Sequence, residues 1–198
     1  NHVFVGWNMI YDEMPEMNIT IEPIFKRVPV KLIAKEGTKT VIDRDTKVIT
    51  GLGLYLSSQA DLDEYLDVEG DGYFTIEYAN NMRGFCGTGA KVKVYDNADP
   101  SAPIETYVIV IYGDINGDSV VTPVDSTFAD DEGLMITDWS QEQIFDGSAI
   151  VANPNYDPYK VMAADINGDG IIDSLDATII GDSSIGIYVI NQVTGKPE

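Results

Sequence analysis

The chain has 198 residues, of which 44% are hydrophobic, and its 33 acidic and 12 basic side chains give a formal net charge of −21. This charge repels nucleic-acid phosphates and anionic lipid surfaces, so we expect no nucleic-acid binding. No apolar run approaches the roughly 18 residues needed to span a bilayer, so we also expect no membrane insertion. The length allows one or two domains with buried cores, and the single cysteine, Cys86, excludes an internal disulfide.

The first part of the chain, up to Tyr112, mostly predicts β-strands. Segments rich in β-branched and aromatic residues are separated by turn sequences such as EGDG and DNADPSAP. The predicted strands are Asn18–Phe25, Val28–Ala34, Thr46–Leu52, Tyr73–Ala79, Ala90–Asp96 and Glu105–Tyr112. One short helix is predicted at Ser57–Leu66, with Ser58 as its N-cap. Short strands at this spacing favour a small β-sandwich.

The pattern changes after Gly113, where we place a domain boundary. Aspartate-rich loops follow, and each runs into a predicted helix. The first helix is Pro123–Ile136, with proline in its first turn. The second is Ser174–Ile180, ending at Gly181, and a long connection separates the two helices. The predicted class is α+β, a β-sandwich followed by a small α-helical domain.

The string DINGD occurs twice, at Asp114–Asp118 and at Asp165–Asp169, and each copy begins a twelve-residue frame. A calcium loop takes oxygen ligands from positions 1, 3, 5, 7, 9 and 12, with a backbone carbonyl at position 7. The corresponding residues are Asp114, Asn116, Asp118, Val120, Thr122 and Asp125 in the first frame, and Asp165, Asn167, Asp169, Ile171, Asp173 and Asp176 in the second. Two complete frames predict two bound Ca²⁺ ions, although an acidic surface that only confers solubility also explains the charge.

The two frames differ at position 6, where the loop turns sharply. The second has Gly170 there, and the first has Ser119. A non-glycine residue at positive φ costs about 1–2 kcal/mol, so we expect the first site to be weaker. The apolar residues at position 8, Val121 and Ile172, are expected to pair the loops through a short strand-like contact. A third acidic stretch, Asp67–Gly72, lacks a closing carboxylate, because Tyr78 stands at position 12, and predicts a hairpin turn.

The phrases VIVIYGDINGD and MAADINGDG, with aspartate closing both frames, closely resemble the duplicated repeats of dockerins, the adaptors of cellulosomes. The departures are Ser119 and the long spacing between repeats, which resembles divergent ruminococcal dockerins. The resemblance implies a non-catalytic, calcium-dependent module that binds a cohesin and attaches its parent protein to a scaffoldin or a cell-surface anchor. It places partner contacts at positions 10 and 11 and on the following helices, namely Pro123, Val124, Phe128, Asp131, Met135, Ser174, Leu175, Ile179 and Asp182.

The preceding region is similar to the X-modules or Ig-like modules that accompany such dockerins, on the phrases TVIDRDTKVITGL and GTGAKVKVYDN. Residues 1–26 resemble the end of a bacterial surface repeat, or instead supply strands to the X-module. The implied division is 1–26, then 27–112 for the X-module and 113–192 for the dockerin. The implied location is extracellular, on a bacterial surface, in a polysaccharide-degrading cellulosome.

Three other classes of function are weighed as alternatives. An enzyme is disfavoured, because no nucleophile, metalloprotease or phosphate-loop motif occurs, the one histidine is His2, and Cys86 is expected to be a small buried residue. A carbohydrate-binding module would use exposed aromatic platforms. Its candidates are Trp7, Tyr11, Tyr55, Tyr73 and Trp139, for most of which packing is the stronger expectation. A structural, calcium-stabilised surface module is the remaining alternative.

Overall fold

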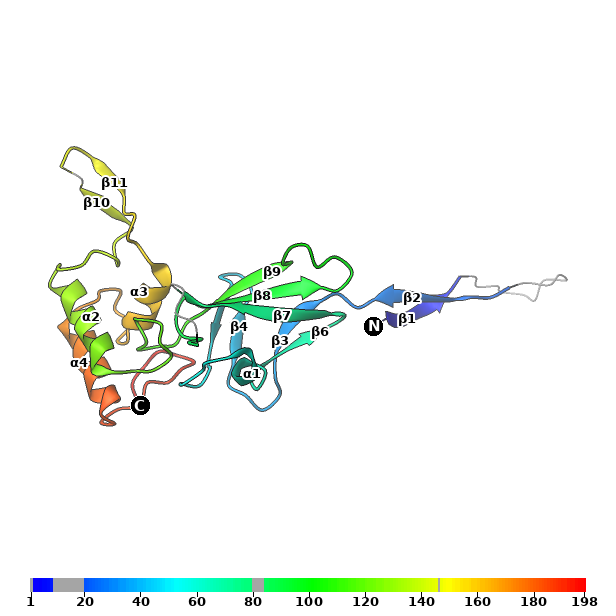
Figure 1. The fold of residues 1–198 in the computed structure, drawn as a ribbon, viewed down its shortest axis with the longest axis horizontal. Helices are drawn as coiled ribbons and strands as arrows, with labels where there is room; N and C mark the ends of the chain where they lie inside the picture. The colour runs from blue at the N-terminus through cyan, green and yellow to red at the C-terminus, as the bar shows by residue number, and fades with distance from the viewer. Residues whose placement is uncertain (1, 9–19, 80–83, 146) are drawn as a thin grey trace.

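The computed structural model describes residues 2–8, 20–79, 84–145 and 147–198. They form an elongated molecule with a β-rich N-terminal part and a helical C-terminal part (Figure 1), so the α+β class is confirmed. The strands are β1 (His2–Trp7), β2 (Pro23–Arg27), β3 (Lys31–Ala34), β4 (Val41–Asp43), β5 (Val48–Thr50), β6 (Leu66–Glu69), β7 (Gly72–Glu77), β8 (Lys91–Asp96), β9 (Glu105–Ile109), β10 (Gln143–Phe145) and β11 (Ile150–Ala152). The helices are α1 (Gln59–Leu62), α2 (Pro123–Gly133), α3 (Pro158–Ala164) and α4 (Ser174–Ser184).

The β-rich part contains a five-stranded sheet and a two-stranded sheet. The larger sheet has the order β4-β5-β9-β8-β7, in which only β5 and β9 are parallel, and the smaller sheet pairs β3 with β6. Side chains from both sheets share one hydrophobic core, which includes Leu32 and Leu66 from the small sheet and Ile49, Val92 and Ile109 from the large one. Burial of such side chains contributes about 1.5–3 kcal/mol each.

The sequence predictions for this part hold with corrections. Each predicted strand overlaps an observed one, but β1, β4 and β6 were not among the predicted strands. The helix is a single turn, α1, capped by Ser58 as predicted, and Leu66 belongs to β6 instead. The stretch Asp67–Gly72 does turn the chain, but it joins strands of different sheets and therefore is not a hairpin. Cys86 is fully buried, as expected, and burial raises the pKa of its thiol to about 11.

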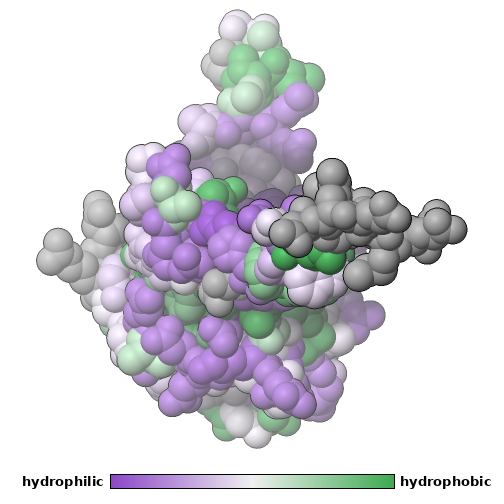
Figure 2. Space-filling model, turned by 90° about the vertical axis from the view of Figure 1, so that its right-hand side faces the viewer, coloured by the Kyte–Doolittle hydropathy of each residue, from purple (hydrophilic) through white to green (hydrophobic). Residues whose placement is uncertain are grey.

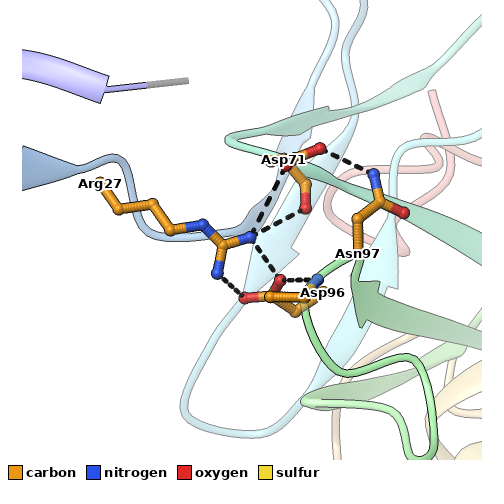
Figure 3. Close-up of polar contacts among 5 residues, drawn as sticks. Arg27, Asp71, Asp96 and Asn97 are labelled. Carbon is orange, nitrogen blue, oxygen red and sulfur yellow. Dashed lines mark hydrogen bonds and ion pairs between the residues drawn. The ribbon is translucent and has the colours of Figure 1, made fainter.

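A two-stranded ribbon, β1 with β2, extends from the end of the β-rich part that faces away from the helices (Figure 1). Arg27, at the end of β2, ties the ribbon to the larger body (Figure 3). Its guanidinium donates to both carboxylate oxygens of Asp96, at 2.8 and 2.5 Å, and to the carbonyl of Asp71 at 3.4 Å. The bidentate pair lowers the pKa of Asp96. The predicted strand Asn18–Phe25 lies partly outside the described residues.

The helical part is built on the packing of α2 against α4. The Ser126 hydroxyl of α2 donates to the carbonyl of Ala177 in α4 at 2.7 Å, and a Cβ on Gly181 would lie 3.1 Å from the Ser126 Oγ. The prediction that α4 ends at Gly181 was wrong, because this glycine lies inside the helix where the two helices approach closely. Helix α2 ends at Gly133, earlier than predicted, and Met135 follows at φ 58°.

The long connection between the repeats is more ordered than its sequence indicated. It contains the hairpin β10–β11 and helix α3, which begins with Asp157 as N-cap and Pro158 in the first turn. This cap and proline were the available signal for α3. The hairpin projects from the helical part, and Figure 2 shows hydrophobic residues gathered at its tip, where Phe145 is 69% exposed and Ile150 is 72% exposed.

The chain end returns to the junction between the two parts. The Gln192 side chain accepts a hydrogen bond from the Tyr112 N–H and donates to the Tyr112 carbonyl, both at 2.8 Å, and the Gln192 carbonyl accepts from the Gly51 N–H at 2.7 Å. Ile111 belongs to the β core, whereas Tyr112 belongs to the helical core. Among the described residues, no helix has the length and apolarity needed to cross a bilayer.

The end of α2 packs closely on the second acidic frame, so we expect an added side chain at Gly133 to be destabilising. A Cβ on Gly133 would lie 2.9 Å from the Asp173 Cα and 3.3 Å from the Ile172 carbonyl oxygen. Alanine normally favours a helix over glycine by about 0.8–1.0 kcal/mol, but here we expect Gly133→Ala to lower the free energy of unfolding by about 1–3 kcal/mol, because backbone must move. Chemical denaturation of the parent and variant chains, both in the presence of calcium, measures this change in the free energy of unfolding.

The control for this experiment is Asp130→Ala in the same helix. We expect its stability to stay within about 0.5 kcal/mol of the parent chain, because the change removes no packed group. A Gly133→Ala chain as stable as this control would show that the end of α2 does not rest on the second frame.

Candidate calcium-binding loops

The first frame folds around Asp114, which is fully buried. Its Oδ1 accepts hydrogen bonds from the N–H groups of Gly117 at 2.8 Å and Asp118 at 3.0 Å. Its Oδ2 accepts from Ser119 and from Thr88, both at 3.0 Å. A single carboxylate therefore gathers the N–H groups of positions 4, 5 and 6 and bends the loop around itself.

Positions 3 and 5 face each other inside this bend. The Asn116 Oδ1 accepts from the Asp118 N–H at 2.8 Å, while the Asn116 amide donates to the Asp118 Oδ2 at 3.0 Å. The Asp118 Oδ1 accepts from the Val120 N–H at 3.0 Å. The side chains at positions 3 and 5 are thus hydrogen-bonded to each other, and the role of positions 1, 3 and 5 as ligands stays a prediction.

The closing carboxylate, Asp125, joins the two ends of the frame. Its Oδ1 accepts from the N–H groups of Ile115 and Asn116, at 2.9 and 3.1 Å. Its Oδ2 accepts from the N–H and the hydroxyl of Thr122, both at 2.9 Å. Thr122 is the N-cap of α2 and Asp125 its third residue, so the two form a capping box. Positions 9 and 12 therefore also start the helix.

The second frame repeats this hydrogen-bond pattern. The Asp176 Oδ1 accepts from Ile166 and Asn167, at 2.9 and 3.1 Å, and its Oδ2 accepts from the N–H of Asp173, the N-cap of α4, at 3.1 Å. The Asp165 carboxylate accepts from Gly168 at 2.8 Å and from Gly170 at 3.1 Å. The sequence duplication is thus a duplication of structure at atomic detail.

The two frames carry negative charge that the protein itself does not neutralise. Burial, followed by the nearby Asp125 and Asp118 charges, raises the pKa of Asp114 to about 7. Burial likewise raises the pKa of Asp125 and Asp176. In the described part of the chain, no lysine or arginine forms an ion pair with a frame aspartate. Backbone hydrogen bonds stabilise these carboxylates in part, and a bound cation would further favour their charged form.

The available donors suit a hard cation. They are carboxylate, amide, hydroxyl and carbonyl oxygens, the ligands that Ca²⁺ prefers. Within the described ranges, no group of three or more His, Cys, Asp or Glu side chains is already gathered as a metal site. The reason is visible at Asp125, whose two oxygens both point to N–H groups of its own frame. The donor chemistry fits calcium, and the carboxylates are held by loop amides.

Position 6 of the first frame has the backbone that the frame requires. Ser119 lies at φ 68°, as predicted, and Gly170 lies at φ 84°. The expected strand-like pairing of Val121 with Ile172 is not found among the described residues, although both side chains pack in the helical core.

The residues suggested for partner contact lie mostly on the outside of α2 and α4. Val124 and Leu175 are each 53% exposed, and Phe128 is 38% exposed. Ile179 is half-buried and packs on the helical core instead. Pro123, Ser174 and Met135 are exposed, while Asp131 and Asp182 are half-buried.

The sequence analysis missed three contacts of the first frame, which come from the β-rich part. Thr88 donates to Asp114, and the N–H groups of Tyr55 and Leu56 donate to the Ser119 carbonyl and hydroxyl. The available signals were the glycines of the CGTG stretch, beginning at Cys86, and the unusual serine itself. The glycines indicated only a turn, and Ser119 indicated only backbone strain at position 6, so neither signal revealed a contact with the β-rich part.

The five aromatic residues suggested for carbohydrate stacking lie in different environments. Trp139 is buried in the helical core, and Tyr73 stacks on Tyr95 with ring centroids 5.2 Å apart. Trp7 and Tyr55 are exposed at separate places in the chain, at 53% and 74%. Tyr11 lies outside the described residues.

Comparison with known proteins agrees with the duplicated frames. Residues 112–182 match the family model of the dockerin type I domain, a span that contains both frames and helices α2 and α3. No curated protein and no solved structure matches the chain. The matched segment is therefore a dockerin domain, a non-catalytic module of the kind that binds cohesins.

Proposed function

We propose that this chain is a calcium-dependent adaptor, whose dockerin domain binds a cohesin and so attaches the parent protein to a cellulosome scaffoldin or a cell-surface anchor. The observation that carries the proposal is the repeated frame. Each frame holds at least one fully buried carboxylate that forms no ion pair within the described residues, and each frame runs without a break into a helix. These two helices pack on each other. Ion binding and the shape of the helix pair therefore depend on the same residues.

Calcium would be held by the six oxygen donors of each frame. They are Asp114, Asn116, Asp118, the Val120 carbonyl, Thr122 and Asp125 in the first, and Asp165, Asn167, Asp169, the Ile171 carbonyl, Asp173 and Asp176 in the second. When bound, two Ca²⁺ ions would neutralise the negative charge of the frame carboxylates. Because the unfolded chain has no such site, binding energy becomes folding energy.

The proposed cohesin-binding face is formed by α2 and α4. Val124 and Phe128 are four residues apart and share one side of α2, as Leu175 and Ile179 do on α4. Exposed apolar side chains beside Pro123 and Ser174 give each helix start a small hydrophobic surface, bordered by Asp131 and Asp182. Met135 extends the surface beyond α2. Because Val124 and Leu175 differ in shape, we propose a single binding orientation.

The β-rich part is proposed as an X-module, a sandwich-like spacer over residues 27–112, with the dockerin over 113–192. The segment 1–26 either supplies the ribbon of this spacer or ends a preceding surface repeat. Support comes from the elongated arrangement, in which the ribbon and the helices lie at opposite ends (Figure 1). An extended spacer of this kind suits an extracellular protein held at a bacterial surface within a polysaccharide-degrading complex.

Calcium binding can be tested by removing one closing carboxylate at a time. We expect the parent chain to bind two ions, and Asp125→Asn and Asp176→Asn each to bind one, because each change removes a charge from one frame only. Isothermal titration with CaCl₂ after treatment with chelator gives the stoichiometry. Asp131→Asn, a change on α2 outside the frame, is the control and should keep two sites. Two full sites in both test variants would contradict the proposed ligands.

Cohesin binding is tested by titrating the chain with a panel of cohesins, first with calcium and then with excess EDTA. We expect one cohesin class to bind with calcium and to lose binding with the chelator. If no cohesin binds while calcium is still taken up, the chain is a calcium-stabilised surface module and the adaptor proposal is wrong.

The binding face and its orientation are tested with Val124→Asp and Leu175→Asp. For a single orientation, we expect one change to weaken binding at least tenfold and the other to have little effect, since a buried apolar contact contributes about 2 kcal/mol or more. Val41→Asp, on the exposed surface of β4, is the control. Small equal losses that become complete only in the double variant would instead indicate two interchangeable orientations.

A further inference from the structure

The two frames begin with the same five residues but have different surroundings. In the first, Asp114 and Ser119 are both fully buried. In the second, Gly168, Asp169 and Gly170 are exposed. The sequence of the loops does not explain this difference, because the string DINGD is common to both. The difference comes from the β-rich part, which covers only the first frame.

Three backbone N–H groups of the β-rich part donate into the first frame. Thr88 donates to the Asp114 Oδ2 at 3.0 Å. Leu56 donates to the Ser119 Oγ at 2.9 Å, and Tyr55 donates to the Ser119 carbonyl at 2.8 Å. In the second frame, the Asp165 Oδ2 accepts from Gly170 of its own loop. One proposed calcium ligand, Asp114, is thus positioned in part by another region of the chain.

The approach of the two regions is close enough to require glycine on both sides. A Cβ on Gly87 would lie 2.4 Å from the Asp114 Oδ2 and 2.4 Å from the Gly117 carbonyl oxygen. A Cβ on Gly117 would lie 2.6 Å from the Thr88 carbonyl oxygen. Gly87 does not have a positive φ, so its need for glycine comes from this contact and not from its own backbone conformation.

This contact accounts for serine at position 6. Gly170, the equivalent residue of the second frame, would meet no atom within 4 Å of an added Cβ. Ser119 instead uses its hydroxyl to satisfy the buried N–H of Leu56, which would otherwise lack a partner. The serine is therefore a docking residue between the two parts, placed where the isolated frame would favour glycine.

We propose that the β-rich part helps to form the first calcium site. The amides of Thr88 and Leu56 position Asp114 and Ser119, so that calcium in the first frame and docking of the β-rich part strengthen each other. The second frame binds its ion independently of this contact. The coupling is reciprocal, because any contact that raises calcium affinity is itself stabilised by calcium. This inference rests on the calcium binding proposed above.

The coupling has a consequence for the whole molecule. Calcium in the first frame would hold the β-rich part and the helix pair in one fixed relation, whereas calcium in the second frame would order only α4 and its contacts. The two ions therefore have different roles, although their loops are nearly identical. Removing one ion or the other separates these roles experimentally.

The test is hydrogen exchange of the Leu56 and Thr88 amides in the full chain, followed by NMR, with calcium and with EDTA. We expect calcium to slow exchange of both amides at least tenfold in the parent chain and in Asp176→Asn. In Asp125→Asn, which lacks the first ion, calcium should not slow them. Equal exchange with calcium and with EDTA in the parent chain would overturn the inference while leaving calcium binding in place.

A second measurement changes one residue on each side of the contact. In Gly87→Ala, the added Cβ would clash with Asp114 and Gly117. Ser119→Ala removes only the hydroxyl and keeps the same backbone restriction. We expect each to lower calcium affinity at one of the two sites about tenfold and to leave the other site unchanged. Gly170→Ser is the matched change in the second frame and should leave exchange at Leu56 and Thr88 as in the parent.

These results distinguish the failure of the inference from the failure of the proposed function. Unchanged affinity at both sites in Gly87→Ala and Ser119→Ala would overturn the coupling, with two bound ions still counted by titration. Absence of any calcium uptake by the parent chain would overturn the calcium-dependent function and the coupling together.

Discussion

The burial of Asp114 and Asp125 in the first frame, and of Asp176 in the second, is the constraint on which the rest of the dockerin domain depends. Asp114, Asp125 and Asp176 have no exposed surface, and burial raises the pKa of each. A buried charge without a partner is costly. Backbone N–H groups donate to these carboxylates, and no lysine or arginine among the described residues forms an ion pair with them. The proposed Ca²⁺ ions would supply the compensating positive charge.

The same carboxylates also determine where the helices begin. Asp125 and Asp176 are the third residues of α2 and α4 and close their capping boxes. A change in either carboxylate therefore affects the loop, the helix start and the packing of α2 on α4 together. If the proposed binding surface is this helix pair, the coupling would make partner recognition dependent on the proposed ion without any contact between ion and partner.

The sequence was sufficient to find the two frames, because each is local and its proposed ligands follow from spacing within twelve residues. It also predicted the starts of α2 and α4, since the capping residues belong to the frames. It failed where the signal was short or depended on distant contacts. Helix α3 has only an aspartate and a proline to mark it, and Gly181 indicated a helix end although it serves close helix packing.

The sequence by itself determined the duplicated calcium frame, the dockerin resemblance and the division into strand-rich and helical regions, because these follow from local spacing and periodicity. Only the tertiary structure decided that the first frame is covered and the second open. Ser119 shows the physical reason. The backbone strain of a serine at position 6 is local and can be inferred from the sequence. Its hydrogen bond is made to Leu56, 63 residues away, and depends on how the two hydrophobic cores pack together.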